Sequence, residues 1–244
     1  MTENTRVALV TGASGGIGRA VAERLAADGM AVAVHYAGNK AAADGAVAAI
    51  TGAGGRAVAV GGDVADERAM AEAFDAVERE FGGIDVVVHT AGVMRLAPIA
   101  ELDLDEFDRV HRTNVRGSFV VAQQAVRRVR AGGAIVLFST SVTKLAFPGY
   151  GAYVASKGAV DALTPVLARE LRGRDVTANA VAPGPTATPL FLDGKDEATV
   201  ERLAKQPPLE RLGTPDDIAE AVSFLAGPGR WVNGQTVYVN GGIA

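Results

Sequence analysis

Short apolar segments alternate with longer helical segments along this 244-residue chain. The runs of strand length are nearly continuous in hydrophobic residues, as in strands covered on both faces, and they are 7–11, 31–36, 57–60, 84–89, 134–138, 176–181 and 236–239. The segments between them favour helices, at 18–28, 41–51, 67–81, 105–130, 153–172 and 215–226. This alternation predicts an α/β fold with a doubly wound, mostly parallel seven-stranded sheet and helices on both faces.

Composition excludes several classes of protein. We expect a single domain over residues 1–244, because no shift in composition divides the chain, and 48% hydrophobic residues allow a large core. The net charge of −4 gives no basic field for nucleic acid or an anionic membrane. No apolar run is long enough to span a bilayer, and the short polar segment 1–6 leaves no room for a signal peptide. Without cysteines and with scattered histidines, we expect no metal site, and the cytoplasm is the default location.

The first predicted strand runs directly into a glycine-rich turn. Residues 11–18 read Thr-Gly-Ala-Ser-Gly-Gly-Ile-Gly, and a predicted helix follows. Glycines let the backbone turn sharply and approach a ligand closely, and the N-terminus of the helix offers unpaired N–H groups to a pyrophosphate. The alternative is a flexible loop without a ligand. Because the turn lies between strand and helix, it predicts a dinucleotide site formed by Gly12, Ser14, Gly15, Gly16, Ile17 and Gly18.

Further motifs follow this turn in order. They are Gly62-Asp63-Val64, His89-Thr90-Ala91-Gly92, Asn114-Val115-Arg116-Gly117, Tyr153-x3-Lys157 and Pro183-Gly184-x3-Thr188. Together with the spacing Thr-Gly-x3-Gly-x-Gly, the set resembles the short-chain dehydrogenase/reductase family over essentially the whole chain, in particular its 3-oxoacyl-carrier-protein reductase-like and carbonyl reductase-like branch. The resemblance implies a single-domain Rossmann fold and an oxidoreductase that moves a hydride between a nicotinamide cofactor and a carbonyl or alcohol.

The resemblance also implies roles for the residues that follow the other strands. Asp63 would contact the adenine of the cofactor, and Lys157 would hold the nicotinamide ribose. The family usually has asparagines at positions 89 and 90. Here we expect His89 to be a core histidine and Thr90 to contact the neighbouring strand. The cofactor-binding residues implied beyond the turn are Asp63, Val64, Thr90, Ala91, Gly92, Tyr153, Lys157, Pro183, Gly184, Thr186 and Thr188.

A catalytic group is predicted around Tyr153 and Lys157, which are four residues apart in a predicted helix and so share one face. A nearby ammonium is expected to lower the pKa of Tyr153, which can then act as general acid or base on the substrate oxygen. The resemblance assigns the hydrogen bond to that oxygen to Thr140, with Ser141 as the substitute, and assigns to Asn114 a water that links the lysine to solvent. The structural alternatives are a solvated helix face for Tyr153 and Lys157, a strand cap for Thr140 and Ser141, and a local helix bend for Asn114.

The end of the second strand bears on the choice of cofactor. An acidic residue there would hydrogen-bond the adenosine ribose and repel a 2′-phosphate. The corresponding position is approximately Tyr36, residues 35–40 contain no carboxylate, and Asn39 and Lys40 could receive a phosphate. The segment therefore favours NADP (NADPH) over NAD.

Residues 188–210 are predicted to form a lid over the substrate, because their helical pattern is weak and they begin and end near prolines. Leu190, Phe191 and Leu192 could line an apolar pocket. The expected partner is a small carbonyl or alcohol, and the leading interpretation is NAD(P)H-dependent reduction of a ketone, aldehyde or 3-oxoacyl group. The alternatives are an NAD-dependent alcohol or sugar dehydrogenase working oxidatively and a non-catalytic nicotinamide-binding sensor.

The resemblance also bears on assembly. Members of the family usually form tetramers in which the long helices, here predicted at 105–130 and 153–172, pack across interfaces. We therefore expect a homotetramer.

Overall fold

A parallel sheet forms the centre of the computed structural model, which describes residues 5–244. Over this range the sheet has seven strands in the order β3-β2-β1-β4-β5-β6-β7, and every neighbouring pair is parallel. The strands are β1 (Val7–Thr11), β2 (Ala31–Tyr36), β3 (Arg56–Gly61), β4 (Ile84–His89), β5 (Val129–Phe138), β6 (Thr177–Pro183) and β7 (Thr236–Val239). The predicted doubly wound α/β fold is confirmed, whereas the predicted N-terminal segment 1–6 lies mostly outside the described residues.

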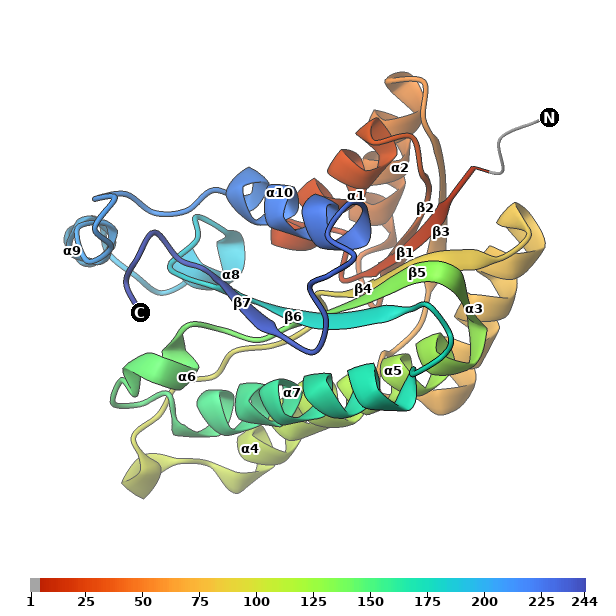
Figure 1. Cartoon of the computed structure of the whole chain (residues 1–244). Coiled ribbons are helices and arrows are strands. Elements are labelled where there is room, and N and C mark those ends of the chain that lie inside the picture. The colour runs from red at the N-terminus through yellow and green to blue at the C-terminus, as the bar shows by residue number, and fades with distance from the viewer. Residues whose placement is uncertain (1–4) are drawn as a thin grey trace.

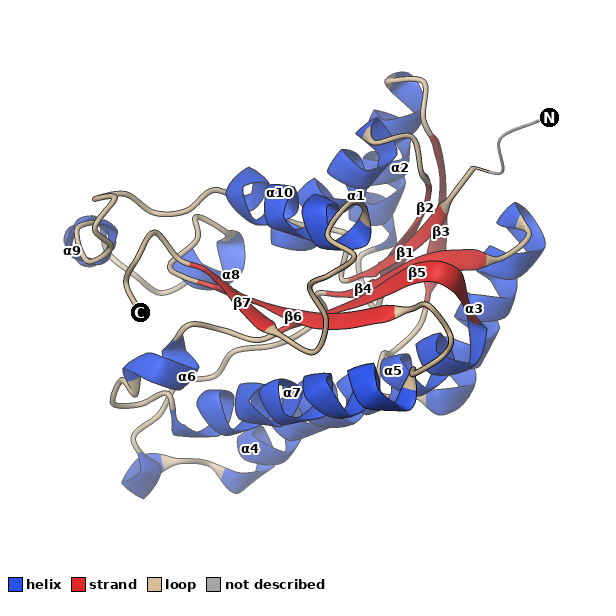
Figure 2. Ribbon diagram, viewed as in Figure 1, coloured by secondary structure: helices blue, strands red, loops and turns tan. Residues whose placement is uncertain are grey.

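Helices cover both faces of the sheet (Figures 1 and 2). One face carries α1 (Gly16–Ala27), α2 (Lys40–Gly52) and α10 (Pro215–Ala226). The other carries α3 (Glu67–Phe81), α4 (Leu104–His111), α5 (Gly117–Arg128) and α7 (Gly151–Glu170). The remaining helical segments lie toward the carboxyl ends of the strands, and they are η1 (Ile99–Glu101), α6 (Val142–Leu145), α8 (Pro189–Leu192) and α9 (Glu197–Ala204).

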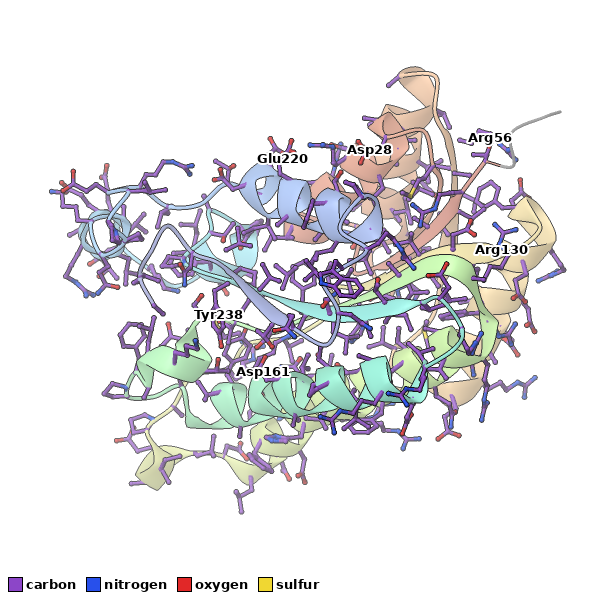
Figure 3. The ribbon with its side chains drawn as sticks, in the orientation of Figure 1. Asp28, Arg56, Arg130, Asp161, Glu220 and Tyr238 are labelled. Carbon is purple, nitrogen blue, oxygen red and sulfur yellow. The ribbon has the colours of Figure 1, made fainter. Side chains whose placement is uncertain are left out.

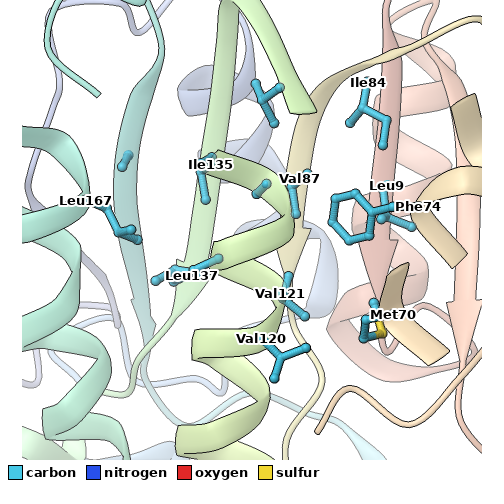
Figure 4. Close-up of a cluster of buried hydrophobic side chains, with 14 of the residues drawn as sticks. Leu9, Met70, Phe74, Ile84, Val87, Val120, Val121, Ile135, Leu137 and Leu167 are labelled. Carbon is cyan, nitrogen blue, oxygen red and sulfur yellow. The ribbon is translucent and has the colours of Figure 1, made fainter. Parts of the chain in front are cut away.

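Each face of the sheet has its own buried apolar layer. On the α3, α5 and α7 side, Phe74 of α3 packs in one cluster with Leu9 of β1 and Ile135 of β5 (Figure 4). On the other side, apolar residues of α1, α2 and α10 meet the opposite faces of the same strands. Figure 3 shows Asp28 and Glu220 where α1 meets α10, and Arg24 forms ion pairs with both. The two layers explain why the strands are apolar along their whole length.

The predicted helix over 105–130 is interrupted near its centre. A π-helical turn, η2 (Arg112–Arg116), separates α4 from α5. Within this wider turn the carbonyl of Asn114 accepts a hydrogen bond from the Ser118 hydroxyl at 2.6 Å. Gly117, which follows η2, lies so close to the segment between β3 and α3 that an added Cβ would be 2.8 Å from Cγ2 of Val64. Contacts with the neighbouring segment therefore accompany a break that helix propensity does not reveal.

The predicted helix also ends too late, because the chain joins β5 already at Val129. Val129 pairs with Ile84 of β4, and the ladder shifts register before it resumes. Arg130 then donates two hydrogen bonds to Asp85, at 2.9 and 2.5 Å. These contacts join residues about 45 positions apart in sequence, so a local pattern cannot report them.

A row of polar side chains crosses β2, β1 and β4 at the carboxyl end of the sheet. His35, Thr11 and His89 are neighbours in register and are almost fully buried. Nδ1 of His89 lies 2.8 Å from the Thr11 hydroxyl, so His89 is a core histidine as predicted. Within the described residues, Nε2 of His89 and both ring nitrogens of His35 have no hydrogen-bond partner. Burial lowers the pKa of His35 to about 4 and that of His89 to about 3.

We predict that the free energy of unfolding falls as the pH drops from about 7.5 to about 5.5. The folded chain keeps both histidines neutral because their pKa values lie below the ordinary one, whereas the unfolded chain protonates them near pH 6.5. Each histidine should contribute about 1.4 kcal/mol to the loss. Urea denaturation at the two pH values, at one protein concentration, measures the effect.

Substitution identifies the source of this pH dependence. His35→Asn and His89→Asn should each remove about half of the difference between the two pH values. If both variants keep the full difference, the buried histidines are not its cause.

Candidate active site

The glycine-rich turn brings the end of β1 against the segment that follows β4. Gly12 and Gly16 have φ values of +68° and +53°, which favour glycine. An added Cβ on Gly12 would lie 2.9 Å from the backbone of Ala91. Helix α1 begins at Gly16, and its N-cap residue, Gly15, provides no side chain to the helix N–H groups. The turn therefore leaves these donors free for an anionic ligand.

A cleft opens above this turn at the carboxyl ends of the strands. The predicted cofactor-binding residues that line it are Gly12, Ser14, Gly15, Gly16, Ile17, Gly18, Asp63, Val64, Thr90, Ala91, Gly92 and Thr188. The sequence analysis missed His35, Ala37, Gly38 and Thr113, which also line it. The signal in the sequence was a histidine at the end of the second predicted strand, but only the fold shows that His35 lines a cleft.

Three of the predicted cofactor-binding residues, among them the two expected to receive a 2′-phosphate, do not line this cleft. Tyr36 packs on the backbone of Gly61. Asn39 caps α2 by accepting a hydrogen bond from the Ala42 N–H at 3.0 Å. Lys40 forms an ion pair with Asp44 at 2.7 Å, one turn along the same helix. Ala37 and Gly38 form the edge of the cleft in their place.

Asp63 and Arg112 form an ion pair at one end of the cleft. Oδ1 of Asp63 accepts a hydrogen bond from the Ala65 N–H at 2.9 Å, and Oδ2 accepts one from Arg112 at 2.6 Å. Burial alone would raise the pKa of Asp63, but these two donors hold it below its ordinary value. The carboxylate is therefore charged and fixed in direction at neutral pH.

The predicted catalytic residues meet beside the cleft, near the first two turns of α7. Lys157 is buried, and its ammonium donates to the carbonyl of Phe138 at 2.8 Å. It lies 5.9 Å from the centre of the Tyr153 ring, one turn away on α7. The Asn114 amide donates to the Val93 carbonyl at 2.9 Å and to the Ser156 hydroxyl at 3.0 Å. Asn114 thus ties the segment after β4 to the helix that carries the tyrosine.

The three hydroxyl residues after β5 have different surroundings. Thr140 lies beside Tyr153, and its side chain opposes the effect of burial on the pKa of the phenol. The hydroxyl of Ser141 donates to the Ala182 carbonyl and accepts from Asn240, each at 3.1 Å, so it is committed to the neighbouring strands. The Ser139 hydroxyl is buried and has no partner within the described residues. The geometry therefore brings Thr140, among the three, to the tyrosine.

The expectation that Lys157 lowers the pKa of Tyr153 is wrong for the chain without bound ligands. Burial raises the pKa of Tyr153 to about 12, and the side chain of Thr140 opposes the rise only in part. Burial also lowers the pKa of Lys157 to about 8, against the raising effect of Asp161. Removal from water outweighs the attraction between the two groups, because the ammonium is directed at a carbonyl rather than at the phenol.

A second hollow adjoins the cleft and shares Ile17, Thr90, Gly92 and Thr188 with it. Thr140, Tyr153 and Lys157 lie on its wall, as do the predicted residues Pro183, Gly184 and Thr186. Leu190 and Phe191 of the predicted lid also line it, whereas Leu192 does not. Over residues 5–244, no group of three or more His, Asp or Glu side chains is placed to hold a metal ion. The arrangement therefore places a tyrosine, a threonine and a lysine on one wall beside a glycine-lined cleft.

Comparison with known proteins decides the family. A family model described as "Enoyl-(Acyl carrier protein) reductase" matches residues 12–244. A "Short-chain type dehydrogenase/reductase" of Picea abies is 45% identical and aligns with 97% of this chain and 92% of the relative. The chain belongs to the short-chain dehydrogenase/reductase family.

Other members of the short-chain dehydrogenase/reductase family show the same likeness. An Arabidopsis thaliana "NADPH-dependent aldehyde reductase-like protein, chloroplastic" is 40% identical, over 97% of this chain and 93% of its own. The crystal structure of a short chain dehydrogenase from Burkholderia cenocepacia J2315 in complex with NADP has a TM-score of 0.91 and 38% identity, and covers 99% of this chain and 98% of that chain. The likeness therefore extends over whole chains.

We predict that Gly18→Ala weakens NADPH binding at least about fivefold, since the cost of such a clash is about 1–3 kcal/mol. An added Cβ would lie 2.4 Å from the Gly12 carbonyl oxygen and 2.5 Å from the Thr90 hydroxyl, and the backbone cannot yield without opening the turn. Titration followed by nicotinamide fluorescence measures the affinity.

Gly45→Ala is the matched control, because Gly45 lies within α2 and an added Cβ there meets no atom within 4 Å. It should bind NADPH as the wild type does. Equal affinities for the two variants would contradict the role of the Gly18 contact.

Proposed function

We propose that this chain reduces a carbonyl compound to an alcohol with NADPH, and that Tyr153 donates the proton. The observation that carries the proposal is the convergence of Tyr153, Thr140 and Lys157 on one hollow that adjoins the glycine-lined cleft. The chain is an NADP(H)-dependent oxidoreductase of the short-chain family, and its reaction class is NAD(P)H-dependent carbonyl reduction. The roles of Tyr153, Thr140 and Lys157 in that reaction are what we propose.

The proposed reaction needs one hydride and one proton, which come from NADPH and from Tyr153. The carbonyl carbon receives the hydride that NADPH supplies when bound, and the carbonyl oxygen takes the proton from the Tyr153 hydroxyl. The Thr140 hydroxyl donates a hydrogen bond to the same oxygen and so holds it beside the phenol. The alcohol leaves, and Tyr153 remains as a phenolate that the Lys157 ammonium stabilises until a proton returns from solvent through Asn114 and its water.

Several features of the cleft fit NADP(H). Gly15 lines the cleft, and a Cβ added there would meet no atom within 4 Å, so it leaves open room that a side chain would fill, and the start of α1 points free N–H groups at it. Neither Ala37 nor Gly38, at its edge, carries a carboxylate that would repel a 2′-phosphate. Asp63 and Val64 would hold the adenine half, and Lys157 the nicotinamide ribose. Tyr36, Asn39 and Lys40 remain candidates for the phosphate only if their side chains turn toward the cleft.

The raised pKa of Tyr153 favours reduction over the oxidative alternative. A phenol with a pKa of about 12 holds its proton at neutral pH, which is the form that reduction consumes. An oxidative enzyme needs the phenolate instead. The sensor alternative has no specific observation in its favour, because both Tyr153 and Lys157 face the hollow.

We predict that Tyr153→Phe lowers kcat for carbonyl reduction at least about 100-fold, because the variant keeps the ring and loses the proton. Its affinity for NADPH, measured by nicotinamide fluorescence, should stay within about twofold, since the hydroxyl faces the substrate hollow. Thr140→Val should lower kcat about tenfold or more, and Thr140→Ser should restore it. A Tyr153→Phe variant with wild-type kcat would contradict the assignment.

We predict that kcat/KM for reduction falls about tenfold per pH unit above pH 8, because Lys157 loses its charge there and no longer stabilises the phenolate. The profile is measured from about pH 6 to 10 with saturating NADPH. Asp161→Asn should move the fall to lower pH, because Asp161 raises the pKa of Lys157. A profile that is flat through pH 9, or one that Asp161→Asn leaves in place, would show that Lys157 does not control it.

The homotetramer remains part of the proposal. Phe119 of α5 and Val166 of α7 are 53% and 48% exposed, on the helices expected to form an interface. Val160, Leu163 and Leu167 of α7 belong to the core of the chain itself.

Over residues 5–244 no helix has the length and apolar character needed to cross a bilayer. The predicted cytoplasmic location is likewise a proposal, and one relative is named chloroplastic.

A further inference from the structure

The hollow beside Tyr153 has mostly apolar and aromatic walls. Met94 follows β4, Leu145 belongs to α6, and Phe147 and Tyr150 precede α7. Leu203 of α9 faces them from the lid. The walls therefore come from segments far apart in sequence, which share apolar character at this one place. A cavity of this kind takes up the apolar body of a ligand and leaves its orientation to a few polar groups.

Charge is nearly absent from these walls. Among the described residues that line the hollow, Lys157 is the one with a charged side chain, and its ammonium is bound by the Phe138 carbonyl. The polar groups at the tyrosine end are hydroxyls, from Thr140 and Tyr153. An anionic substrate group would leave water and would meet, on the walls formed by the described residues, only an ammonium that a carbonyl already binds, which is costly. The walls therefore favour a substrate without charge.

Aromatic rings form one side of the hollow. The rings of Phe147 and Tyr150 stand edge to face, with centroids 5.9 Å apart and planes at 63°. Phe191 of α8 adds a third ring from the lid. Such a set offers both ring faces and ring edges to a flat apolar group, and a planar aromatic body packs well against them.

The polar end and the mouth of the hollow are distinct. Thr140 is buried, whereas Gln206, after α9, also lines the hollow but is exposed to solvent. The substrate carbonyl belongs at the buried end, and the rest of the molecule extends past the rings toward Gln206. A charge placed at position 206 would therefore act on the outer part of the substrate.

We propose that the substrate is an uncharged ketone or aldehyde with an aromatic body beside the carbonyl, held by the aromatic set Phe147, Tyr150 and Phe191. This assignment rests on the proposed function, because it takes the carbonyl to lie at Tyr153. The apolar walls select for this chemical class, and Phe147 in particular selects for the aromatic ring.

Three substrates separate charge from shape. Ethyl benzoylformate is a neutral aryl ketone, benzoylformate is the same aryl ketone as an anion, and ethyl pyruvate is neutral without a ring. With NADPH and the intact protein, kcat/KM should be at least about tenfold higher for ethyl benzoylformate than for either of the others.

Two variants test the assignment. Each is judged by the ratio of kcat/KM for two substrates, compared with the same ratio for the wild type, so that the intrinsic reactivity of the substrates cancels. Phe147→Ala should reduce the preference for ethyl benzoylformate over ethyl pyruvate at least about fivefold. Gln206→Lys should raise kcat/KM for benzoylformate relative to kcat/KM for ethyl benzoylformate by about fivefold, since it brings a cation to the mouth of the hollow. Gln235→Lys makes the same change at an exposed residue before β7 that does not line the hollow, and it should alter neither ratio.

Binding provides a measurement that does not depend on turnover. Calorimetry of the NADPH-saturated protein with ethyl mandelate and with mandelate should show the neutral alcohol bound more tightly, and Phe147→Ala should weaken it. This binding pattern without turnover on any carbonyl would overturn the proposed function and support the assignment of the pocket. Turnover with equal or better use of the anions, unchanged ratios in Phe147→Ala, or no binding of ethyl mandelate would overturn the assignment itself.

Discussion

The contact between the end of β1 and the end of β4 is the constraint on which the site depends. Thr11 pairs with His89 in register, and the Thr90 hydroxyl donates to the Thr11 carbonyl at 2.5 Å. Beyond this point α1 and the segment after β4 diverge to opposite faces of the sheet, which opens the cleft. Because Gly12 has no side chain, the two backbones can approach closely enough to keep that opening narrow and fixed.

Burial governs the chemistry of the residues around the cleft more than their charges do. Tyr153 and Lys157 are one turn apart, yet each shifts toward its neutral form because few water molecules reach it. His35 and His89 follow the same rule on the far side of Thr11. The site thus holds a protonated phenol and an amine whose pKa lies below that of an ordinary lysine.

The fold could be predicted from sequence because strands buried on both faces carry an unmistakable apolar pattern, and the glycine-rich turn follows from spacing. Other features depend on contacts that no local pattern contains. The start of β5 depends on the hydrogen bonds between Arg130 and Asp85. The direction of Lys40 depends on Asp44, which satisfies its charge away from the cleft. The pKa of Tyr153 depends on burial by walls that come from segments on both sides of α7 in the sequence. The spacing to Lys157 therefore predicted the position of Tyr153 but not its acidity.

The π-helical turn η2 reaches both the cleft and α7 within five residues. Arg112 at its start binds Asp63, and Asn114 at its centre binds Val93 and Ser156. Loss of a single residue would return this turn to an ordinary α-helix and rotate the two side chains away from their partners together. The segment is therefore a stretch of fixed length in this chain, which can keep both contacts through substitutions elsewhere in the turn but not through an insertion or deletion within it.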